Sequence, residues 1–282
     1  MKNLSDIEYL IESALLEDIG DGDHTSLACI PLNTKGKARL LIKEKAVLAG
    51  VEVAKMVYSI FDKNLKLNFN FKDGDKVVPG DIAFTVEGNI HSILSTERLV
   101  LNFMQRMSGI ASYTNYLVSL IEGSHTIILD TRKTTPCLRE IEKWAVRIGG
   151  GNNHRNGLYD MIMIKDNHID FCGSIEKSIF STLDYLSTTG KDLKIEIEAR
   201  NLDDVREILR VGKINRIMLD NFSISMLEEA VRLIDKRYET EASGGINESN
   251  IRSVAQTGVD FISIGALTHQ IKSKDMSLKA EI

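Results

Sequence analysis

The chain has 282 residues, of which 43% are hydrophobic and 27% are charged, and its formal net charge is -5 at pH 7. These values are ordinary for a soluble globular protein with one large domain or two modest ones. The acidic balance and the lack of a long Lys/Arg tract argue against a nucleic-acid-binding protein.

The N-terminal segment and the cysteines indicate the cellular compartment and the kind of stabilisation to expect. Residues 1–26 carry acidic side chains inside an apolar-periodic stretch, which is untypical of a secretory signal or a membrane span. We therefore expect a cytoplasmic protein without membrane association. Three cysteines, an odd number without C-x-x-C spacing, disfavour a disulfide framework and a structural zinc site: Cys29, Cys137 and Cys172.

The first 122 residues predict an α+β domain, sandwich-like in character. Apolar residues at helical spacing predict an amphipathic helix over 4–18, stopped by glycines. Period-two alternation and Gly-containing turns over 37–87 predict a small, mostly antiparallel sheet. A long helix is predicted over 96–121, with Ser95 as its N-cap.

Residues 123–268 predict an α/β domain, because short apolar runs alternate with helical stretches. The final segment, 269–282, is expected to return to the N-terminal domain. The predicted strands cover 127–129, 161–164, 193–197, 216–219, 238–242 and 261–264, and the predicted helices cover 138–148, 175–186, 202–211, 224–236 and 246–257.

Each predicted strand ends in residues capable of chemistry, from Asp130 after the first strand to Ser263 at the last. Functional groups at the carboxyl ends of consecutive strands indicate a (β/α) barrel, incomplete relative to eight units. A doubly wound sheet would concentrate them at one switch point, and no G-x-G-x-x-G follows the first strand.

Residues 130–168 concentrate positive charge, with seven Lys/Arg and five Asp/Glu side chains. Because the rest of the chain is acidic, this local excess predicts a small anionic ligand rather than a polyanion. Arginine forks suit carboxylates or phosphates, whereas lysines act as point charges. His154 either donates to the same anion or braces its loop. The candidate cations are Arg132, Lys133, His154, Arg155 and Lys165.

Two glycine elements follow the last two strands: Ser243-Gly244-Gly245 and Gly265-Ala266. Glycines at this place in a barrel let backbone N–H groups approach a phosphate closely.

Glu198 and Asp220 each end an apolar run, where an unpaired acid is costly. They either hold ribose hydroxyls, or bind Mg²⁺ through water, or form ion pairs with Lys133 or Lys165.

Several long motifs together carry a resemblance to one family. They are DTRKTTPCLREIEKWAVRIGGGNNHRNGLYDMIMIKDNH (130–168), EDIGDGDHTS (17–26), ERLVLNFMQRMSGIAS (97–112), EIEARNLDD (196–204), IMLDN (217–221), SGGI (243–246) and DFISIGALTH (260–269). With these motifs the chain resembles the quinolinate phosphoribosyltransferases over almost its whole length. The resemblance implies phosphoribosyl transfer from phosphoribosyl pyrophosphate to quinolinate with loss of CO₂, giving nicotinate mononucleotide and pyrophosphate in NAD biosynthesis, with Mg²⁺ required.

The resemblance also implies roles for individual residues. Arg132, His154, Arg155 and Lys165, with Thr131, resemble the quinolinate-binding residues, and Lys133 resembles a lysine that reaches both substrates. Glu198 and Asp220 resemble the carboxylates that contact ribose and Mg²⁺. The phosphate-binding loops correspond to Ser243, Gly244, Gly245, Ser263, Gly265 and Ala266. Arg106 matches an arginine that enters the neighbouring subunit's site, which implies a homodimer.

Two departures from the family pattern are Cys137, where glycine is common, and Gln270, where serine is usual. Cys137 is costly if that position needs a positive φ. Three other interpretations stay open: a nicotinate phosphoribosyltransferase, a molybdenum-associated homologue and a catalytically silent metabolite-binding module. The intact set of Lys133, Glu198 and Asp220 argues against the silent module.

Overall fold

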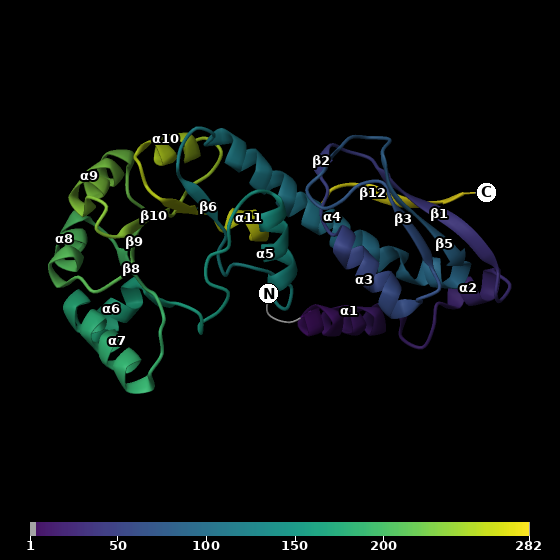
Figure 1. Cartoon of the computed structure of the whole chain (residues 1–282), viewed down its shortest axis with the longest axis horizontal. Coiled ribbons are helices and arrows are strands. Elements are labelled where there is room, and N and C mark those ends of the chain that lie inside the picture. The colour runs from purple at the N-terminus through teal and green to yellow at the C-terminus, as the bar shows by residue number, and fades with distance from the viewer. Residues whose placement is uncertain (1–3, 282) are drawn as a thin grey trace. The chain divides into compact units, whose positions relative to one another are not determined.

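The computed structural model describes residues 4–281, which divide into two compact units (Figure 1). Unit 1 comprises residues up to 115 together with 134–150 and those from 267 onward, and unit 2 comprises 116–133 and 151–266. The predicted domain boundaries assign 134–150 to the barrel, whereas the contacts of these residues group them with unit 1.

Unit 1 is built on an antiparallel sheet of four strands in the order β12-β1-β5-β3. Its strands are β1 (Lys35–Ile42), β3 (Lys66–Phe69), β5 (Ile82–Asn89) and β12 (Met276–Glu281). Buried and exposed residues alternate along β1, as expected for a sheet with one face on a core. A second, two-stranded sheet pairs β2 (Ala46–Val47) with β4 (Lys76–Val77).

The helices of unit 1 correct two predictions. The segment predicted as sheet only contains an 11-residue helix, α3 (Val51–Phe61), whose apolar residues pack inward. The long helix α4 (Ile90–Leu120) begins six residues before the predicted start, and the Asn89 side chain accepts a hydrogen bond from the backbone N–H of His91. Ser95 therefore lies inside the helix and is not its N-cap. The other helices are α1 (Leu4–Ile19), α2 (His24–Cys29) and α5 (Arg139–Ile148).

Unit 2 is a parallel sheet of six strands in the order β6-β11-β10-β9-β8-β7. Because β6 and β7 are the two edges and do not pair with each other, the sheet is an incomplete barrel, which confirms the predicted fold class. The strands are β6 (Ile127–Leu129), β7 (Ile162–Ile164), β8 (Ile195–Ala199), β9 (Arg216–Asp220), β10 (Glu239–Ser243) and β11 (Phe261–Ser263).

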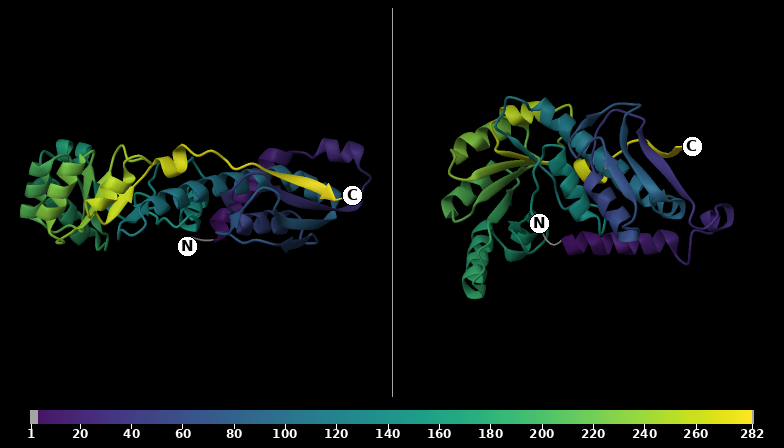
Figure 2. Two further views of the ribbon diagram at one scale, coloured as in Figure 1. Left: turned by 90° about the horizontal axis from the view of Figure 1, so that it is seen from above. Right: turned by 45° about the vertical axis from the view of Figure 1, so that its right-hand side comes forward.

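Helices cover the outside of this sheet, as the ribbon views show (Figure 2). They are α6 (Asp166–Cys172), α7 (Ile175–Thr189), α8 (Leu202–Val211), α9 (Ile224–Ile234) and α10 (Ile251–Gln256). The short α11 (Ala266–His269) follows β11, and all but its first residue belong to unit 1. The α10 helix begins five residues later than predicted, because Asn247 and Asn250 form a hydrogen-bonded turn with the carbonyl of Gly245 instead. Helices α6 and α11 were not predicted.

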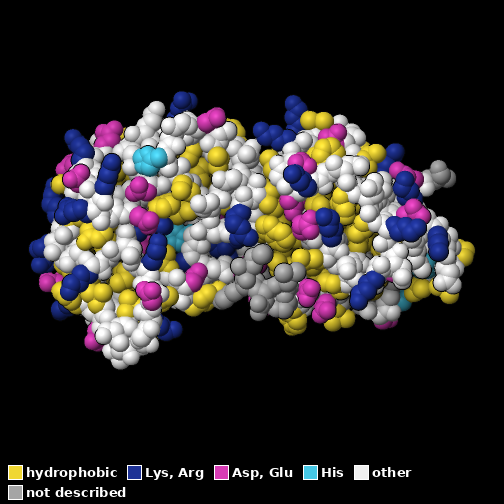
Figure 3. Space-filling view, in the orientation of Figure 1, with side chains coloured by type: hydrophobic (Ala, Val, Ile, Leu, Met, Phe, Trp, Pro, Cys, Tyr) yellow, Lys and Arg dark blue, Asp and Glu magenta, His cyan; other side chains and the backbone are white. Residues whose placement is uncertain are grey.

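The surface charges, the helix lengths and the cysteines can be compared with the expectations from the sequence. Positive and negative side chains are interspersed on the face seen in Figure 3, without a broad basic patch. None of the helices in the described part of the chain is long and apolar enough to cross a membrane. The three cysteines are free thiols.

Cys137 occupies a backbone conformation that favours glycine, because its φ is 65°. We expect Cys137→Gly to raise the free energy of unfolding by about 0.5–1 kcal/mol. Glycine removes the strain of a Cβ in the left-handed region, but its greater conformational freedom in the unfolded state offsets part of that gain. Denaturant unfolding measures the change. Asn33→Gly, at a φ of 66°, is the control and should gain less, because asparagine tolerates this region. A loss of stability in Cys137→Gly would contradict the strain.

Candidate active site

The parallel sheet of unit 2 brings the candidate residues to one end, because its strands all run in the same direction and their carboxyl ends lie together. Asp220 closes β9 directly opposite Ser243 at the end of β10. Glu198 lies near the end of β8 and Lys165 follows β7. Thr131, Arg132 and Lys133 follow β6, with the Thr131 hydroxyl accepting a hydrogen bond from the Lys133 backbone N–H at 3.0 Å.

Arg132 and Arg155 form the cationic part of the site at this end of the sheet. Burial lowers the pKa of the Arg155 guanidinium and the positive charge of Arg132 lowers it further, while the negative charges of Glu196 and Asp160 oppose the shift. Two neighbouring arginines repel each other unless an anion compensates them. The pair is therefore suited to a ligand that carries negative charge, and planar forks favour carboxylate or phosphate groups.

Glu198 and Asp220 form the acidic part. The Glu198 side chain is buried, and both burial and the negative charge of Asp220 raise its pKa, while Lys165 opposes the shift. Its Oε2 atom has no hydrogen-bond partner among residues 4–281. A buried carboxylate oxygen without a partner indicates that a hydroxyl, a water or a metal ion completes its surroundings.

The glycine loop after β10 is shaped so closely that only glycine fits at Gly244. Its φ is +91°, and a Cβ there would lie 2.2 Å from the side-chain oxygen of Asn221. Asn221 itself has a φ of 56°, and its backbone N–H donates to the carbonyl of Ser243. Gly245 also has a positive φ, with open space around it. Such a loop presents backbone N–H groups to an anion without side chains in the way.

The three further members of the predicted phosphate-binding set differ in exposure. Gly265 is half-buried where the chain leaves β11, as is Ala266 at the first position of α11. Ser263, in contrast, is buried, and its hydroxyl donates to the carboxylate of Glu241. Its backbone remains at the strand end, but its side chain is committed to the interior.

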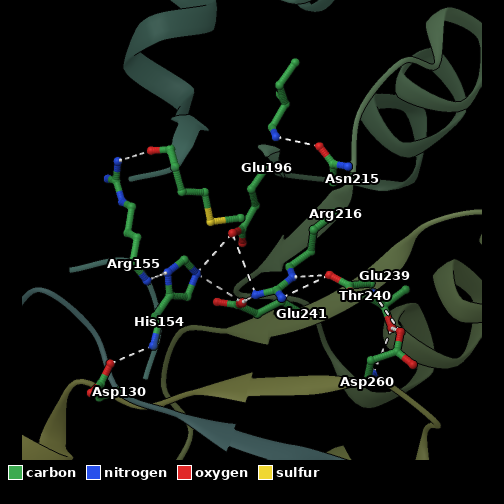
Figure 4. Close-up of polar contacts among 12 residues, drawn as sticks. Asp130, His154, Arg155, Glu196, Asn215, Arg216, Glu239, Thr240, Glu241 and Asp260 are labelled. Atoms are coloured by element: carbon green, nitrogen blue, oxygen red, sulfur yellow. Dashed lines mark hydrogen bonds and ion pairs between the residues drawn. The ribbon is translucent and has the colours of Figure 1, made fainter. Parts of the chain in front are cut away.

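His154 lies deeper than a surface ligand would. Its backbone N–H donates to Asp130 at 2.8 Å, and its Nδ1 accepts the backbone N–H of Arg155 at 2.6 Å. Its Nε2 lies 3.0 Å from Glu196 Oε2 and 3.2 Å from Glu241 Oε2 (Figure 4). Of the two alternatives left open by the sequence, these contacts favour the histidine that braces its loop.

The charge state of His154 follows from the carboxylates that face it. Burial alone would lower the pKa of His154, but Glu196 and Glu241 outweigh burial and raise it to about 9. That pKa favours the cation, whereas a ring that accepts at Nδ1 is neutral and carries its proton on Nε2. The 2.6 Å contact from the Arg155 N–H to Nδ1 decides for the neutral ring, whose proton lies on Nε2 between the two carboxylates.

Arg106 belongs to unit 1 and is tied to residues of that unit. Its guanidinium forms an ion pair at 2.6 Å with the buried Glu142. It also donates to the Thr135 hydroxyl and to the carbonyl of Thr268.

Glu196, Glu241 and Arg216, which contact His154 or one another, are not among the predicted site residues. In the sequence, Glu196 and Glu241 stand out only as acids near predicted strand ends, and Arg216 only as the first residue of a predicted strand. The available signal was the alternation along β8, where Glu196 and Glu198 are two residues apart and so point to the same face. The partner of Glu196 could be found only with the register, which places Arg216 opposite it.

Comparison with known proteins settles the family. Residues 23–108 match the family model described as the N-terminal domain of quinolinate phosphoribosyl transferase, and residues 110–279 match the model of its C-terminal domain. The chain belongs to the quinolinate phosphoribosyltransferase family. The resemblance seen in the sequence motifs is thereby confirmed.

Individual relatives agree over nearly the whole chain. A quinolinate phosphoribosyltransferase [decarboxylating] of Nicotiana tabacum is 45% identical over 98% of this chain and 83% of its own length. A probable nicotinate-nucleotide pyrophosphorylase [carboxylating] of Bacillus subtilis is 40% identical, covering 96% and 92% of the two chains. The solved structure of the nicotinate-nucleotide pyrophosphorylase of Francisella tularensis matches with a TM-score of 0.93 at 38% identity, over 100% of this chain and 98% of that one.

Proposed function

We propose that this member of the family transfers the phosphoribosyl group of phosphoribosyl pyrophosphate to quinolinate with decarboxylation, giving nicotinate mononucleotide, pyrophosphate and CO₂ in NAD biosynthesis. The observation that carries the proposal is the pairing, at one end of the barrel, of two mutually repelling arginines with two mutually repelling carboxylates. The arginines suit a pyridine dicarboxylate, and the carboxylates suit a sugar whose anomeric carbon becomes positive.

The substrates divide the site between them. Arg132 and Arg155 hold the two carboxylates of quinolinate together with Lys165 and Thr131. His154 braces the loop that carries Arg155. Lys133, which is exposed, reaches both substrates. The Ser243-Gly244-Gly245 loop and Gly265 bind the phosphates through backbone N–H groups.

The reaction needs no protein nucleophile. The bond between the anomeric carbon and pyrophosphate breaks, and its electron pair leaves with pyrophosphate. Glu198 and Asp220 stabilise the positive charge that develops on the ribose, while the clamped quinolinate presents its ring nitrogen to that carbon. When the carboxylate at ring position 2 leaves as CO₂, its electron pair stays on the ring carbon beside the now cationic nitrogen. A proton from solvent completes nicotinate mononucleotide.

Glu198 and Asp220 are also the residues that fit Mg²⁺, through water. The partnerless Oε2 of Glu198 and the adjacent charge of Asp220 provide the one or two carboxylates that this ion normally uses. When bound, Mg²⁺ neutralises the charge of the pyrophosphate leaving group.

The direct test is to incubate the purified protein with quinolinate, phosphoribosyl pyrophosphate and Mg²⁺. The expected result is nicotinate mononucleotide together with an equal amount of CO₂, detected with quinolinate labelled in its 2-carboxylate. Turnover of nicotinate without CO₂ release would instead indicate a nicotinate phosphoribosyltransferase. Binding of the sugar diphosphate without any turnover would indicate a silent binding module.

Gly244→Ala should impair binding of phosphoribosyl pyrophosphate specifically. A Cβ at this position would collide with Asn221 and occupy a φ that L residues disfavour, so the loop must move. We expect KM for phosphoribosyl pyrophosphate to rise by about tenfold or more, while KM for quinolinate changes little. Gly258→Ala is the control: its φ is also positive, but its Cβ would meet only Val231 at 3.7 Å. A Gly244→Ala enzyme with unchanged KM values would contradict a phosphate role for this loop.

The active form is a homodimer in this proposal, with Arg106 of each subunit reaching the neighbouring subunit's site. The exposed part of the Arg106 side chain, beside its ion pair to Glu142, supports a role outside its own unit. Mixing inactive Arg106→Ala and Lys133→Ala subunits tests this. If Arg106 acts in trans, random hybrids should recover about a quarter of wild-type activity, because half of the dimers carry one intact site each. No recovery after subunit exchange would mean that Arg106 acts within its own chain.

A further inference from the structure

A cluster of four ionisable side chains is buried in unit 2, close to Arg155 (Figure 4). Glu196 and Glu241 are fully buried, and Arg216 and His154 are only 9% and 8% exposed. The four residues come from β8, β10, β9 and the loop before β7, respectively. None of the steps of the proposed reaction uses Glu196, Glu241 or Arg216.

Glu241 joins the cluster together. Its Oε2 accepts a hydrogen bond from Arg216 Nη1 at 2.8 Å and lies 3.2 Å from His154 Nε2. The hydroxyl of Ser263 donates to the same carboxylate. Arg216 is in turn fixed on its other side, because its guanidinium stacks on the Phe261 ring at 3.9 Å and bonds to Glu239. Arg216, which donates to Glu241, is therefore itself held in place.

His154 connects this cluster to the main chain of Arg155. With its Nε2 edge held by Glu196 and Glu241, the ring can offer only Nδ1 to the main chain, and Nδ1 accepts the N–H of Arg155. Asp130 fixes the backbone of the same turn from the other side. The main chain at Arg155 is thus connected through His154 to the buried carboxylates Glu196 and Glu241.

We propose that Glu241, Glu196 and Arg216 are positioning residues for dicarboxylate recognition, which fix the His154 ring and, through it, the main chain at Arg155. The proposal rests on the proposed function, because it gives these residues a part in quinolinate binding. None of the three touches the substrate. The predicted direct contact of His154 with quinolinate is replaced by an indirect role, since both ring nitrogens already face protein groups.

A metal ion is the alternative occupant of this cluster. His154, Glu196 and Glu241 have ligand atoms within 4.8 Å of one another, a spacing that a metal could use. Arg216 argues against it, because its guanidinium lies 2.8 Å from Glu241 Oε2 and 3.9 Å from Glu196 Oε2. The arginine and the Nε2 proton of His154 already supply positive charge to both carboxylates, and a divalent ion would have to displace that proton.

Glu241→Gln tests the proposal with almost no change of shape. Calorimetry with quinolinate, and with phthalate as an unreactive 1,2-dicarboxylate, is compared with titration by phosphoribosyl pyrophosphate and Mg²⁺. We expect both dicarboxylates to bind about ten- to a hundredfold more weakly, while affinity for the sugar diphosphate stays within about twofold. In ¹⁵N-histidine NMR, the His154 ring signals should shift or broaden in the variant.

Glu239→Gln is the matched control. It also removes a carboxylate from Arg216, at 3.0 Å, but Glu239 is partly exposed and does not touch His154. Its dicarboxylate affinity should stay within about twofold of wild type. If Glu241→Gln does not fold, Arg216→Lys serves instead, because it keeps the charge but loses the fork, and it should show the same selective loss to a smaller degree.

The outcomes separate this proposal from the proposed function. Equal losses for dicarboxylate and sugar diphosphate, or none for either, would overturn the positioning role. So would a stoichiometric metal in the wild-type protein whose removal by a chelator abolishes phthalate binding. A wild-type protein that binds both dicarboxylates but forms no mononucleotide would refute the proposed function alone, since the positioning role is measured by binding.

Discussion

Arg155→Met is expected to lower kcat/KM for quinolinate by about 10²- to 10³-fold, roughly 3–4 kcal/mol of transition-state stabilisation. The Arg155 guanidinium is partly buried, so solvent screens its attraction for a bound anion only weakly. Removing one of two arginines leaves a dicarboxylate with an uncompensated negative group. Steady-state kinetics at varied quinolinate measures the change, and KM for phosphoribosyl pyrophosphate should stay nearly constant.

The Arg155 prediction has a control on the same side of the barrel. Arg200 follows β8 and forms exposed ion pairs with Asp170 and Asp204, so it carries the same charge without burial. Arg200→Met should change kcat/KM by less than about threefold. If Arg155→Met stays within about tenfold of wild type, or ~1.4 kcal/mol, Arg155 is not a ligand of the carboxylates.

The barrel half of the fold was largely predictable, because its strands are short apolar runs whose ends are marked by charged or glycine residues. Strand β6 and helix α8 were predicted to the residue. The α3 helix was missed because it lies within a long stretch of alternating strands and has no side-chain cap, its N-cap being Gly50 in a left-handed conformation. The early start of α4 was hidden because the Asn89 cap closes a strand as well.

The site was predictable where a residue's type and its place at a strand end were enough. Glu198, near the end of β8, and Lys165, directly after β7, belong to this class. The interior network was not, because its meaning depends on which strands are neighbours: Glu241 matters through Arg216 and His154, each on a different element. The depth of His154 likewise follows from two hydrogen bonds to Asp130 and Arg155 that no spacing in the sequence specifies.

Glu198→Gln is expected to reduce kcat by about 10²- to 10³-fold while leaving the fold at least as stable as wild type. The carboxylate is buried, close to Asp220, and has an oxygen without a partner, so its charge costs stability in the free protein and contributes to catalysis. Burial and Asp220 raise its pKa from the ordinary 4.5, which means that the ionised form destabilises the folded state at higher pH. Glutamine removes that charge at nearly constant volume.

The sign of the pH dependence makes the Glu198 prediction specific. Well below pH 4.5, the Glu198 carboxyl is protonated in both the folded and the unfolded protein, so wild type and variant should unfold alike. As the pH rises above that value, the variant should gain in free energy of unfolding relative to wild type, in thermal melts without added metal. Glu229→Gln, an exposed acid paired with Arg206, should show neither the activity loss nor the gain. A Glu198→Gln protein that is less stable than wild type at pH 7 would instead identify Glu198 as a structural ion-pair partner.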